Sequence, residues 1–397
     1  MTAGWETKAL GEVCEFRGGG TPSKQRADFW NGSIPWVSPK DMKSVEISDS
    51  IDHITESAIK GSATALIPSG SVLMVVRSGI LARTVPIGIT TRSLTVNQDL
   101  KALVPGEHLD PWFLYYALKS CEQGLLGTVT RGATVHRLGS ESIKSLRIPL
   151  PPLEEQKRIV AILDAAFADI DVAQLNVRTM GTATSEIIDG FVMGLFEGEG
   201  SDWARHPLIE VCDYFYDSAH RTPKYSPIGR PALRPRDVVG GQINFERVAR
   251  VSDAEFQSQC KRYEPTAGDI VYSRELSLGW AAIVPEAHAV CLSQGMCVFG
   301  VRKTADATYM TTVLNSSFGR RQALSAAVGT AHPHLNLGDI KAIQIPVPPR
   351  DRQEAVMLQI EAVSSQVDRL QRNVDRSSDC LVDLRRSLLH QAFSGQL

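Results

Sequence analysis

The sequence has few of the features that mark membrane-bound, disulfide-rich or metal-binding proteins. Its 397 residues contain no run of about 18 apolar residues that could cross a bilayer, and Met1 is not followed by a secretion signal. Only seven residues are cysteine, without a CxxC pair, so neither a disulfide framework nor a zinc site is indicated. Cys291 and Cys297, the closest pair, are predicted to be buried free thiols. We expect an intracellular, cytoplasmic protein that does not associate with a membrane.

The sequence also lacks the motifs of common nucleotide-dependent and hydrolytic enzymes. It has no GxxxxGK[ST] loop, because Gly18-Gly19-Gly20 is followed by Thr21-Pro22, and no GxGxxG follows a strand pattern. Amino-methyltransferase, HExxH and nucleophile-elbow elements are missing as well. Acid–base chemistry by Asp41 with His53 stays open, but no pattern singles this pair out. The chain is therefore predicted to be non-catalytic.

What the sequence does contain is a repeat with a period of 197 residues. Ile148-Pro149-Leu150-Pro151-Pro152 returns as Ile345-Pro346-Val347-Pro348-Pro349, and with a shift of one residue Pro39-Lys40-Asp41 corresponds to Pro235-Arg236-Asp237. Solenoid repeats are about 20–50 residues long, so this repeat indicates a duplicated domain. The predicted boundaries are residues 1–152 for the first globular domain, 153–200 for a helix and linker, 201–349 for the second globular domain and 350–397 for a second helix.

A heptad pattern of apolar residues follows each copy of the proline motif. Because proline cannot donate a backbone hydrogen bond, each Pro-Pro pair is predicted to stand just before a helix. A helix over residues 154–195 would be roughly 60 Å long, and such a stripe favours antiparallel pairing of the two helices over packing on one domain surface. Thr184 and Ser377 interrupt the seam. The predicted pairing positions are Ile159, Leu163, Ile170, Val177, Ile187, Val356, Ile360, Val367, Val374 and Leu384.

The net charge of −2 is unevenly distributed along the chain. Residues 1–152 and 201–349 each contain 16 Lys and Arg against 14 Asp and Glu, whereas residues 153–200 contain 3 against 9. Residues 350–397 balance at 7 against 7. Mildly basic globular domains and an acidic or neutral spacer are compatible with domains that contact phosphate while the helices stay clear of it.

Each globular domain is predicted to mix helices and strands. Asp110 followed by Pro111 predicts a capped helix that runs to Leu118. The predicted fold class is therefore α+β, with two duplicated domains joined by two long, antiparallel coiled-coil helices. Apolar runs predict strands at 71–76, 87–90, 270–273 and 298–301, with a turn or strand at 66–68.

The proline motif that opens a long helix, present twice, resembles the specificity subunit of type I DNA restriction–modification enzymes. Other matching features are Gly20-Thr21-Pro22-Ser23, Ile34-Pro35-Trp36-Val37, Pro68-Ser69-Gly70 and Pro151-Pro152-Leu153-Glu154-Glu155-Gln156. The resemblance as a whole covers essentially the whole chain. The second half departs from the pattern, because Arg234 replaces the serine expected before Pro235 and Asp351-Arg352 replaces Glu154-Glu155. These departures leave the overall assignment intact.

The resemblance implies two target-recognition domains that each read one half of a bipartite site in double-stranded DNA. The paired helices would set the spacer between the half-sites and dock two methyltransferase (modification) subunits, with restriction and translocase subunits as further partners. S-adenosylmethionine and ATP are expected on those partner subunits and no cofactor in this chain. A two-headed coiled-coil scaffold that binds protein or carbohydrate is the alternative, and a lone nuclease or methyltransferase would lack its motifs.

DNA contacts are expected from basic and polar residues in loop-like positions that recur in both domains. The loops at Gly132 and Gly329 are the preferred pair, since each lies just before its long helix. His332 and His334, which flank Pro333, suit ligand contact better than metal binding because they have no acidic neighbours. The predicted residues are Lys24, Lys40, Arg77, Arg131, Thr134 and His136 in the first domain, and Arg221, Lys224, Arg236, Arg274, Thr330, His332 and His334 in the second.

Overall fold

The computed structural model describes residues 4–132, 134–198, 202–329 and 332–397, which divide into two compact units. Unit 1 comprises Met1–Val177 and Arg376–Leu397, and unit 2 comprises Arg178–Asp375. Each unit holds one globular domain and parts of the two longest helices, α6 (Leu153–Glu197) and α12 (Arg350–Ser394). The division between the units therefore falls inside both helices, whereas the sequence places the domain boundaries at the helix ends.

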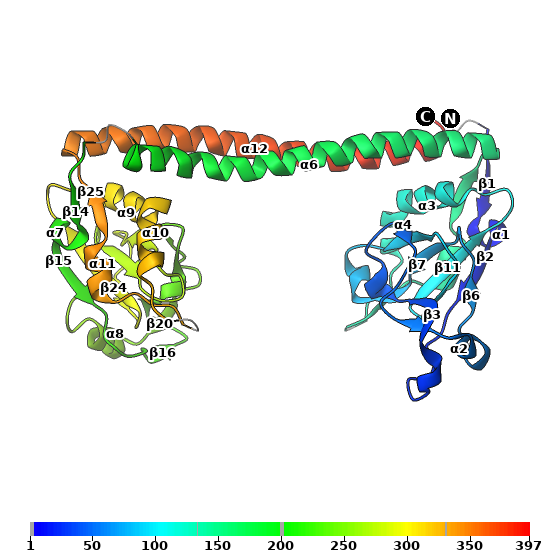
Figure 1. Cartoon of the computed structure of the whole chain (residues 1–397), viewed down its shortest axis with the longest axis horizontal. Helices are drawn as coiled ribbons and strands as arrows, with labels where there is room; N and C mark the ends of the chain where they lie inside the picture. The colour runs from blue at the N-terminus through cyan, green and yellow to red at the C-terminus, as the bar shows by residue number, and fades with distance from the viewer. Residues whose placement is uncertain (1–3, 133, 199–201, 330–331) are drawn as a thin grey trace. The chain divides into compact units, whose positions relative to one another are not determined.

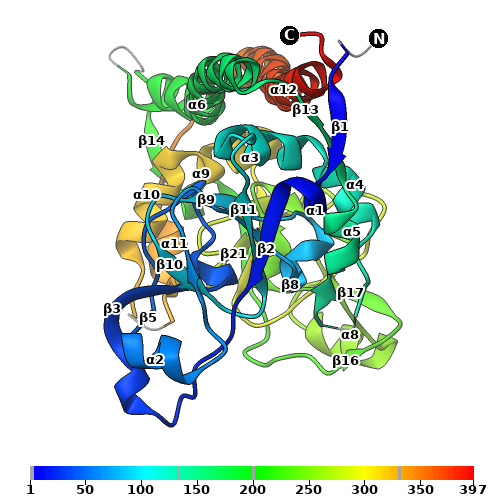
Figure 2. The same cartoon turned by 90° about the vertical axis from the view of Figure 1, so that its right-hand side faces the viewer.

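The globular domain of unit 1 is built on a five-stranded sheet of order β2–β11–β7–β9–β4 and a four-stranded sheet of order β5–β3–β10–β6. Figure 2 labels β2, β9 and β11 of the first sheet and β3, β5 and β10 of the second. Helix α3 (Pro111–Ser120) lies between the five-stranded sheet and α6 (Figure 1), where Tyr116 contacts Phe167 edge to face. The strands are β1 (Glu6–Ala9), β2 (Cys14–Gly18), β3 (Trp30–Val37), β4 (Glu46–Ile47), β5 (His53–Ile54), β6 (Leu66–Ile67), β7 (Val72–Val75), β8 (Arg77–Ser78), β9 (Ile87–Thr90), β10 (Leu94–Val96), β11 (Leu100–Pro105), β12 (His136–Arg137) and β13 (Arg147–Leu150). The other helices are α1 (Leu10–Val13), α2 (Glu56–Gly61), α4 (Glu122–Gly127) and α5 (Ser140–Lys144), with 3-10 turns η1 (Ala27–Phe29), η2 (Pro39–Asp41) and η3 (Gly79–Ala82).

Unit 2 repeats much of this plan with sheets of order β15–β24–β21–β22 and β16–β20–β17–β23. In both units the second sheet contains a parallel strand pair, β3 with β10 in the middle of the unit 1 sheet and β17 with the edge strand β23 in unit 2. The strands are β14 (Arg205–Pro207), β15 (Cys212–Asp217), β16 (Tyr225–Ser226), β17 (Arg230–Leu233), β18 (Val238–Val239), β19 (Gln242–Ile243), β20 (Ala249–Val251), β21 (Ile270–Ser273), β22 (Ala281–Ile283), β23 (Cys291–Leu292), β24 (Met296–Val301) and β25 (Gln344–Pro346). The helices are α7 (Leu208–Val211), α8 (Asp253–Gln259), α9 (Ala307–Asn315), α10 (Ser317–Ala326) and α11 (Leu337–Ala342), with the 3-10 turn η4 (Pro235–Asp237).

The predicted α+β fold class with two long helices is confirmed, as are the local elements expected from composition. The side chain of Asp110 caps α3 by accepting hydrogen bonds from the backbone N–H groups of Trp112 (2.9 Å) and Phe113 (3.0 Å). Asp306 caps α9 in the same way. The two caps hold matching helices in the two units, so the duplication visible in the sequence is also a duplication of structure.

A buried glutamine fastens α6 to the globular domain of unit 1. The Gln156 side chain is completely buried, and its Oε1 accepts a hydrogen bond from the Asp110 N–H at 2.8 Å. Its Nε2 donates to the carbonyl oxygens of His108 (2.9 Å) and Pro151 (2.8 Å). One side chain thus ties the cap of α3 and the chain entering α6 to the start of α6 itself.

The same arrangement recurs in unit 2. Gln353 is also completely buried, and its Oε1 accepts from the Asp306 N–H at 2.9 Å. Its Nε2 donates to the carbonyl oxygens of Thr304 (2.9 Å) and Pro348 (2.8 Å). A buried amide that satisfies three backbone groups is costly to replace, because no aliphatic side chain can make these bonds. The repeated proline motif is therefore one part of a repeated junction between domain and helix.

The two long helices pair in antiparallel directions within each unit. In unit 1 the early part of α6 meets the end of α12, where Arg385 forms an ion pair with Asp171. In unit 2 the end of α6 meets the early part of α12, where Thr184 donates a hydrogen bond to Gln371 Oε1 at 2.7 Å. Thr184, which the sequence marks as an interruption of the seam, therefore has a polar partner in the facing helix.

Most predicted pairing positions are removed from solvent, but the heptad register does not hold to the ends. Ile187 and Leu384 are 45% and 47% exposed, and Ser377 is exposed as well. The sequence prediction that these three residues lie in the buried seam is therefore corrected. An α-helix has 3.6 residues per turn, so a strict 3.5-residue pattern drifts around it. The buried positions are Ile159, Leu163, Ile170, Val356, Ile360, Val367 and Val374, with Val177 half-buried.

The cysteines are free thiols, as the sequence predicts for the closest pair. Cys291 and Cys297 are buried and unbonded, and burial raises the pKa of the Cys291 thiol to about 12. None of the described helices is long and apolar enough to cross a bilayer.

The glutamine junctions predict a specific loss of stability. Gln156→Ala or Gln353→Ala removes the partner of one N–H and two carbonyl groups, of which the Pro151 or Pro348 carbonyl oxygen is bonded in a buried position and the other two groups are part-buried. An unsatisfied buried group costs about 1–3 kcal/mol, and each of the other lost hydrogen bonds about 0.5–1.5 kcal/mol. We expect the free energy of unfolding to fall by about 3 kcal/mol or more in urea denaturation of the full chain. The exposed Gln123, replaced by alanine, serves as the control and should change it by less than about 0.5 kcal/mol. Equal curves for all three variants would contradict the proposed role.

Candidate nucleic-acid interface

The repeated sequence Pro-Lys/Arg-Asp forms a 3-10 turn in each unit, η2 and η4. Asp41 Oδ2 accepts hydrogen bonds from the backbone N–H and hydroxyl of Ser38, both at 2.8 Å. Asp237 accepts from the backbone N–H of Arg234 at 2.9 Å and from its guanidinium at 2.8 Å. The aspartate thus stabilises the turn itself. The Arg234 guanidinium makes the side-chain hydrogen bond to the aspartate that the Ser38 hydroxyl makes in unit 1.

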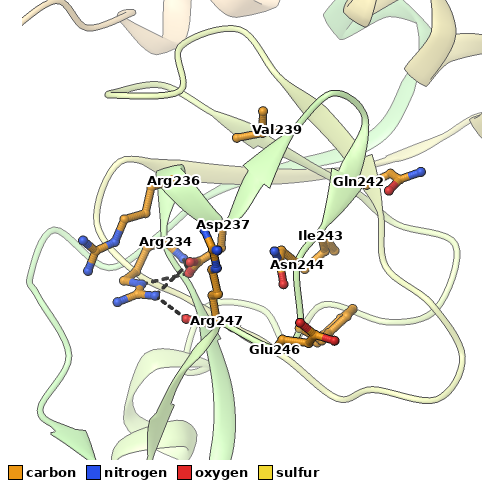
Figure 3. Close-up of a pocket in the computed structure, with 10 residues that line it drawn as sticks. Arg234, Arg236, Asp237, Val239, Gln242, Ile243, Asn244, Glu246 and Arg247 are labelled. Carbon is orange, nitrogen blue, oxygen red and sulfur yellow. Dashed lines mark hydrogen bonds and ion pairs between the residues drawn. The ribbon is translucent and has the colours of Figure 1, made fainter. Parts of the chain in front are cut away.

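The basic residue in the middle of each turn points away from this internal bonding. Arg236 is exposed and forms no ion pair within the described chain, and it borders a concave surface of about 1030 Å³ (Figure 3). Figure 3 shows Arg234 bonded to Asp237 and to the Arg247 carbonyl oxygen, while Arg236 extends away from them. Lys40, the counterpart in unit 1, forms an ion pair with Asp52 at 2.7 Å, which raises the pKa of the lysine ammonium. Arg236 is therefore more available to an anion than Lys40.

In unit 1, a small antiparallel sheet brings several predicted residues together. Strand β12 pairs with β8, which sets His136 opposite Ser78 and Arg137 opposite Arg77. A bridge between Thr130 and Arg137 folds the intervening loop back onto β12. Arg131 and Thr134, both exposed, belong to the segment that leads into β12.

The strand pair β8–β12 and the segment leading into β12 are together called the unit 1 hairpin, and its electrostatics favour a negatively charged partner. Two arginines directly opposite each other on adjacent strands repel. Within the described chain, Asp99 is the only carboxylate that forms an ion pair with either of them, at 3.8 Å from Arg77 Nε. Arg137 is exposed and its guanidinium has no hydrogen-bond partner among the described residues. A bound phosphate between the two guanidinium groups would relieve this repulsion.

The corresponding place in unit 2 has a different chemistry. Glu275 and His334 form the bridge that matches the β8–β12 pair, and His334 also bridges Val328. Arg274, the counterpart of Arg77, is 13% exposed and donates to Asp217 Oδ1 at 2.7 Å and to the Leu335 carbonyl oxygen at 3.1 Å. Arg274 thus supports the fold, so a DNA contact would have to displace these bonds, and its prediction as a DNA-binding residue stays a prediction.

In unit 2 the η4 turn is adjacent to the two segments joined by the Glu275–His334 bridge, which are together called the unit 2 hairpin. Gly295 lies between them with φ of +85°, and a Cβ atom there would lie 3.0 Å from both Glu275 Cδ and Pro235 Cγ. Only glycine tolerates this backbone conformation and this close approach together. Gly295 therefore allows Arg236 and the hairpin to share one surface.

The remaining predicted DNA-binding residues differ in their exposure and in whether other side chains of the protein bind them. Lys24 and Lys224 are exposed and form no ion pair within the described residues. Arg221 is bound to Glu255 Oε1 at 2.6 Å and to Ser258 Oγ at 2.8 Å, so a DNA contact would have to displace these bonds. His332 is exposed, and His136 and His334 are half-buried. Thr330 lies outside the described residues.

No group of three or more His, Cys, Asp or Glu in the described chain is placed to hold a metal ion. His334 Nδ1 instead lies 3.4 Å from the His332 carbonyl oxygen. The ligand contact predicted for His332 and His334 stays a prediction.

Sequence reasoning missed Arg137, Glu275 and Leu276. Arg137 follows a predicted residue, His136, and its charge alone could have suggested it. Glu275 and Leu276 follow the predicted Arg274, but neither residue type signals nucleic-acid contact by itself. The pairing of Glu275 with His334 and the hydrogen bonds between Arg274 and Leu335 show that the two segments meet.

A second concave surface of unit 2, of about 960 Å³, does not suit a phosphate chain. It lies where α9 meets the long helices and contains the carboxylate Asp189 but no lysine or arginine. Its counterpart in unit 1 measures about 330 Å³, because Trp112, Tyr115 and Tyr116 stand where α9 carries threonines. The basic surfaces around Arg137 and Arg236 are therefore the better candidates for nucleic acid.

Comparison with known proteins gives a consistent picture. The family described as type I restriction modification DNA specificity domain matches residues 2–177 and 201–372. A type I restriction enzyme specificity subunit of Escherichia coli is 44% identical over 161 residues, and one of Methanocaldococcus jannaschii is 32% identical over 163 residues. These matches cover 40% of this chain in both cases, and 40% and 37% of the two relatives, so less than two thirds of either relative is spanned.

Two solved structures share the fold over the full length of the chain. One comes from a study of complex assembly and conformational transition of the type I R-M system, with a TM-score of 0.73 and 20% identity, covering 100% of this chain and 99% of that one. The other is the HsdS subunit of Thermoanaerobacter tengcongensis, with a TM-score of 0.61 and 19% identity, covering 100% and 98%. At these identities the likeness shows the fold alone.

The contrast between Arg274 and Arg236 leads to a prediction on stability. Arg274→Ala leaves Asp217, 8% exposed, with His220 Nε2 at 3.0 Å as its remaining partner, which is charged only when protonated. Removing one partner of a buried pair costs about 3–5 kcal/mol. Arg236→Ala removes an exposed charge and should change the free energy of unfolding by less than about 0.5 kcal/mol. Chemical denaturation of both variants checks this difference. An Arg274→Ala protein as stable as the unaltered chain would contradict the structural role of Arg274.

Proposed function

The chain belongs to the family of type I restriction–modification DNA specificity domains, and on this premise we propose that it is the DNA-binding specificity subunit of a type I restriction–modification complex. Each unit reads one half of a two-part site in double-stranded DNA. The chain itself selects the sequence and carries out no chemical step. Methylation and cleavage are performed by partner subunits, with which the protein acts on cytoplasmic DNA.

The observation that carries this proposal is the arginine-rich hairpin of unit 1. Arg77 and Arg137 face each other across β8 and β12, and Arg131 is exposed on the adjoining loop. Arginine binds both phosphate oxygens and the O6 and N7 edge of guanine with two parallel hydrogen bonds. A short two-stranded ribbon is also narrow enough to enter the major groove, which is about 12 Å wide.

The hairpin of unit 2 supports a half-site of a different sequence. Its side chains are an acid, an aliphatic residue and imidazoles: Glu275 and His334 are half-buried, and Leu276 and His332 are exposed. A carboxylate accepts hydrogen bonds from the amino groups of cytosine and adenine, which an arginine cannot do. Two recognition surfaces of unlike chemistry favour an asymmetric target.

The long helices are proposed to set the separation of the half-sites and to dock two methyltransferase subunits. The acidic excess of residues 153–200 disfavours contact between this segment and phosphate, which leaves the helices free for protein partners. S-adenosylmethionine would be bound by the methyltransferase subunits, and ATP by the restriction and translocase subunits.

The function is tested by mapping adenine methylation in the host genome, with the gene intact and deleted. Deletion is expected to remove methylation from one gapped, two-part motif, because the partner enzymes then lack a subunit that recognises DNA. Restoring the gene should restore the same motif. An unchanged methylation map, together with failure of the purified complex to bind DNA, would refute the proposal.

Alanine substitutions in the unit 1 hairpin separate base contacts from phosphate contacts. Arg131→Ala and Arg137→Ala are expected to weaken DNA binding of the assembled complex by about 1–3 kcal/mol if they read a base, with relaxed selection at one position. A phosphate contact would instead weaken all sequences alike and reduce the salt slope by about 1. Binding is measured by fluorescence anisotropy at several salt concentrations. Lys144→Ala, which removes an exposed lysine paired with Glu141, is the matched control and should bind normally.

A further inference from the structure

Leu276 has a backbone conformation that leucine rarely adopts. Its φ is +57°, and within the described chain only one other non-glycine residue, Asn31, has a positive φ. The left-handed conformation brings Cβ too close to the following carbonyl oxygen, a cost of roughly 1–2 kcal/mol for a residue other than glycine. Asparagine offsets this cost through local hydrogen bonds of its side chain, which leucine cannot make. Leu276 is thus strained in a backbone conformation that glycine would adopt without strain.

Burial does not compensate for this strain, because Leu276 is 74% exposed. The turn is instead held from both sides. The Ser273 hydroxyl donates to the Glu275 carbonyl oxygen at 2.9 Å, and the Gly279 N–H donates to the Ser273 carbonyl oxygen at 2.9 Å. The buried ion pair of Arg274 anchors the residue that precedes the turn. A rigid turn therefore holds one large aliphatic side chain out into solvent.

The surroundings of Leu276 are suited to the edge of a base pair. A concavity of about 450 Å³ is lined by Leu276 with Glu275, His332, Pro333 and His334. The carboxylate and imidazole groups provide hydrogen-bond acceptors and donors around a single aliphatic group. Gly79 occupies the matching position of unit 1, 197 residues earlier, and has no side chain. The aliphatic group is thus specific to the surface of unit 2.

We propose that Leu276 is a base-reading residue of unit 2, whose side chain contacts the C5-methyl group of a thymine in the major groove. This inference rests on the proposed function. The methyl group of thymine is the apolar feature by which the major groove distinguishes T·A from C·G, and aliphatic side chains recognise it by contact. The neighbouring Glu275 carboxylate disfavours a position against the phosphates, which directs the turn toward base edges.

The test combines a glycine substitution with removal of the thymine methyl group. Leu276→Gly removes the side chain at a position where glycine suits the backbone, so the complex should remain folded and at least as stable. Each thymine of both half-sites is replaced in turn by deoxyuridine, which differs only in lacking the methyl group. Binding of the assembled complex to each duplex is measured by fluorescence anisotropy.

For the unaltered protein, one deoxyuridine position should weaken binding about fourfold, which corresponds to about 0.8 kcal/mol for one buried methyl group. Leu276→Gly should bind the thymine and deoxyuridine duplexes equally at that position. Ile228→Ala, which truncates another exposed aliphatic residue of unit 2, is the control and should retain the fourfold difference. Leu276→Ala, which keeps the strained backbone, should behave like the glycine variant.

Two results would overturn the inference. One is a protein that is insensitive to deoxyuridine at every position, or a target site whose half-sites contain no thymine. The other is a glycine variant that keeps the sensitivity of the unaltered protein. In either case specific DNA binding would persist, so the proposed function would stand, whereas a complex without any specific DNA binding would refute the proposed function first.

Discussion

The architecture depends on a hydrogen-bonding junction that occurs once in each unit. Gln156 and Gln353 are fully buried and bind the same three backbone groups in their respective units. Because a buried amide must satisfy its donors and acceptors at fixed positions, it defines the path of the chain more strictly than apolar packing does. Each junction joins a capped domain helix, the Pro-Pro entry and a long helix. The proline motif and the glutamine are therefore two parts of one structural unit that was duplicated.

The duplicated framework supports surfaces that have diverged. The backbone hydrogen bonds that place the hairpins recur, since Leu138 N–H donates to the Val76 carbonyl oxygen and Leu335 N–H to the Arg274 carbonyl oxygen, both at 2.9 Å. On this shared framework unit 1 presents Arg137, whereas unit 2 presents Leu276. Loop side chains can change in this way without cost to the core, because they contribute little to its packing. A protein that reads two different half-sites would need this separation of framework from contact surface.

Much of the fold could be predicted from local patterns. Proline before a helix, aspartate at a cap and apolar periodicity act over a few residues, so they located α3, β21 and both long helices. Register over long distances was less predictable, as the exposed Ile187 and Leu384 illustrate. The Gly18-Gly19-Gly20 run is a further example. A Cβ atom at Gly19 would lie 1.7 Å from the Val96 carbonyl oxygen, a contact that cannot be read from the run itself.

The sequence by itself determined the duplication, the fold class and the family resemblance, because these depend on the order and spacing of residues along one chain. Tertiary structure decided which charges remain available to a ligand. Arg274 and Arg236 look alike in sequence, but a buried aspartate from β15 binds Arg274, and no described carboxylate binds Arg236. The position of Leu276 beside His334 likewise follows from a bridge between segments about 60 residues apart. Such pairings arise from packing of distant segments, so no local pattern could reveal them.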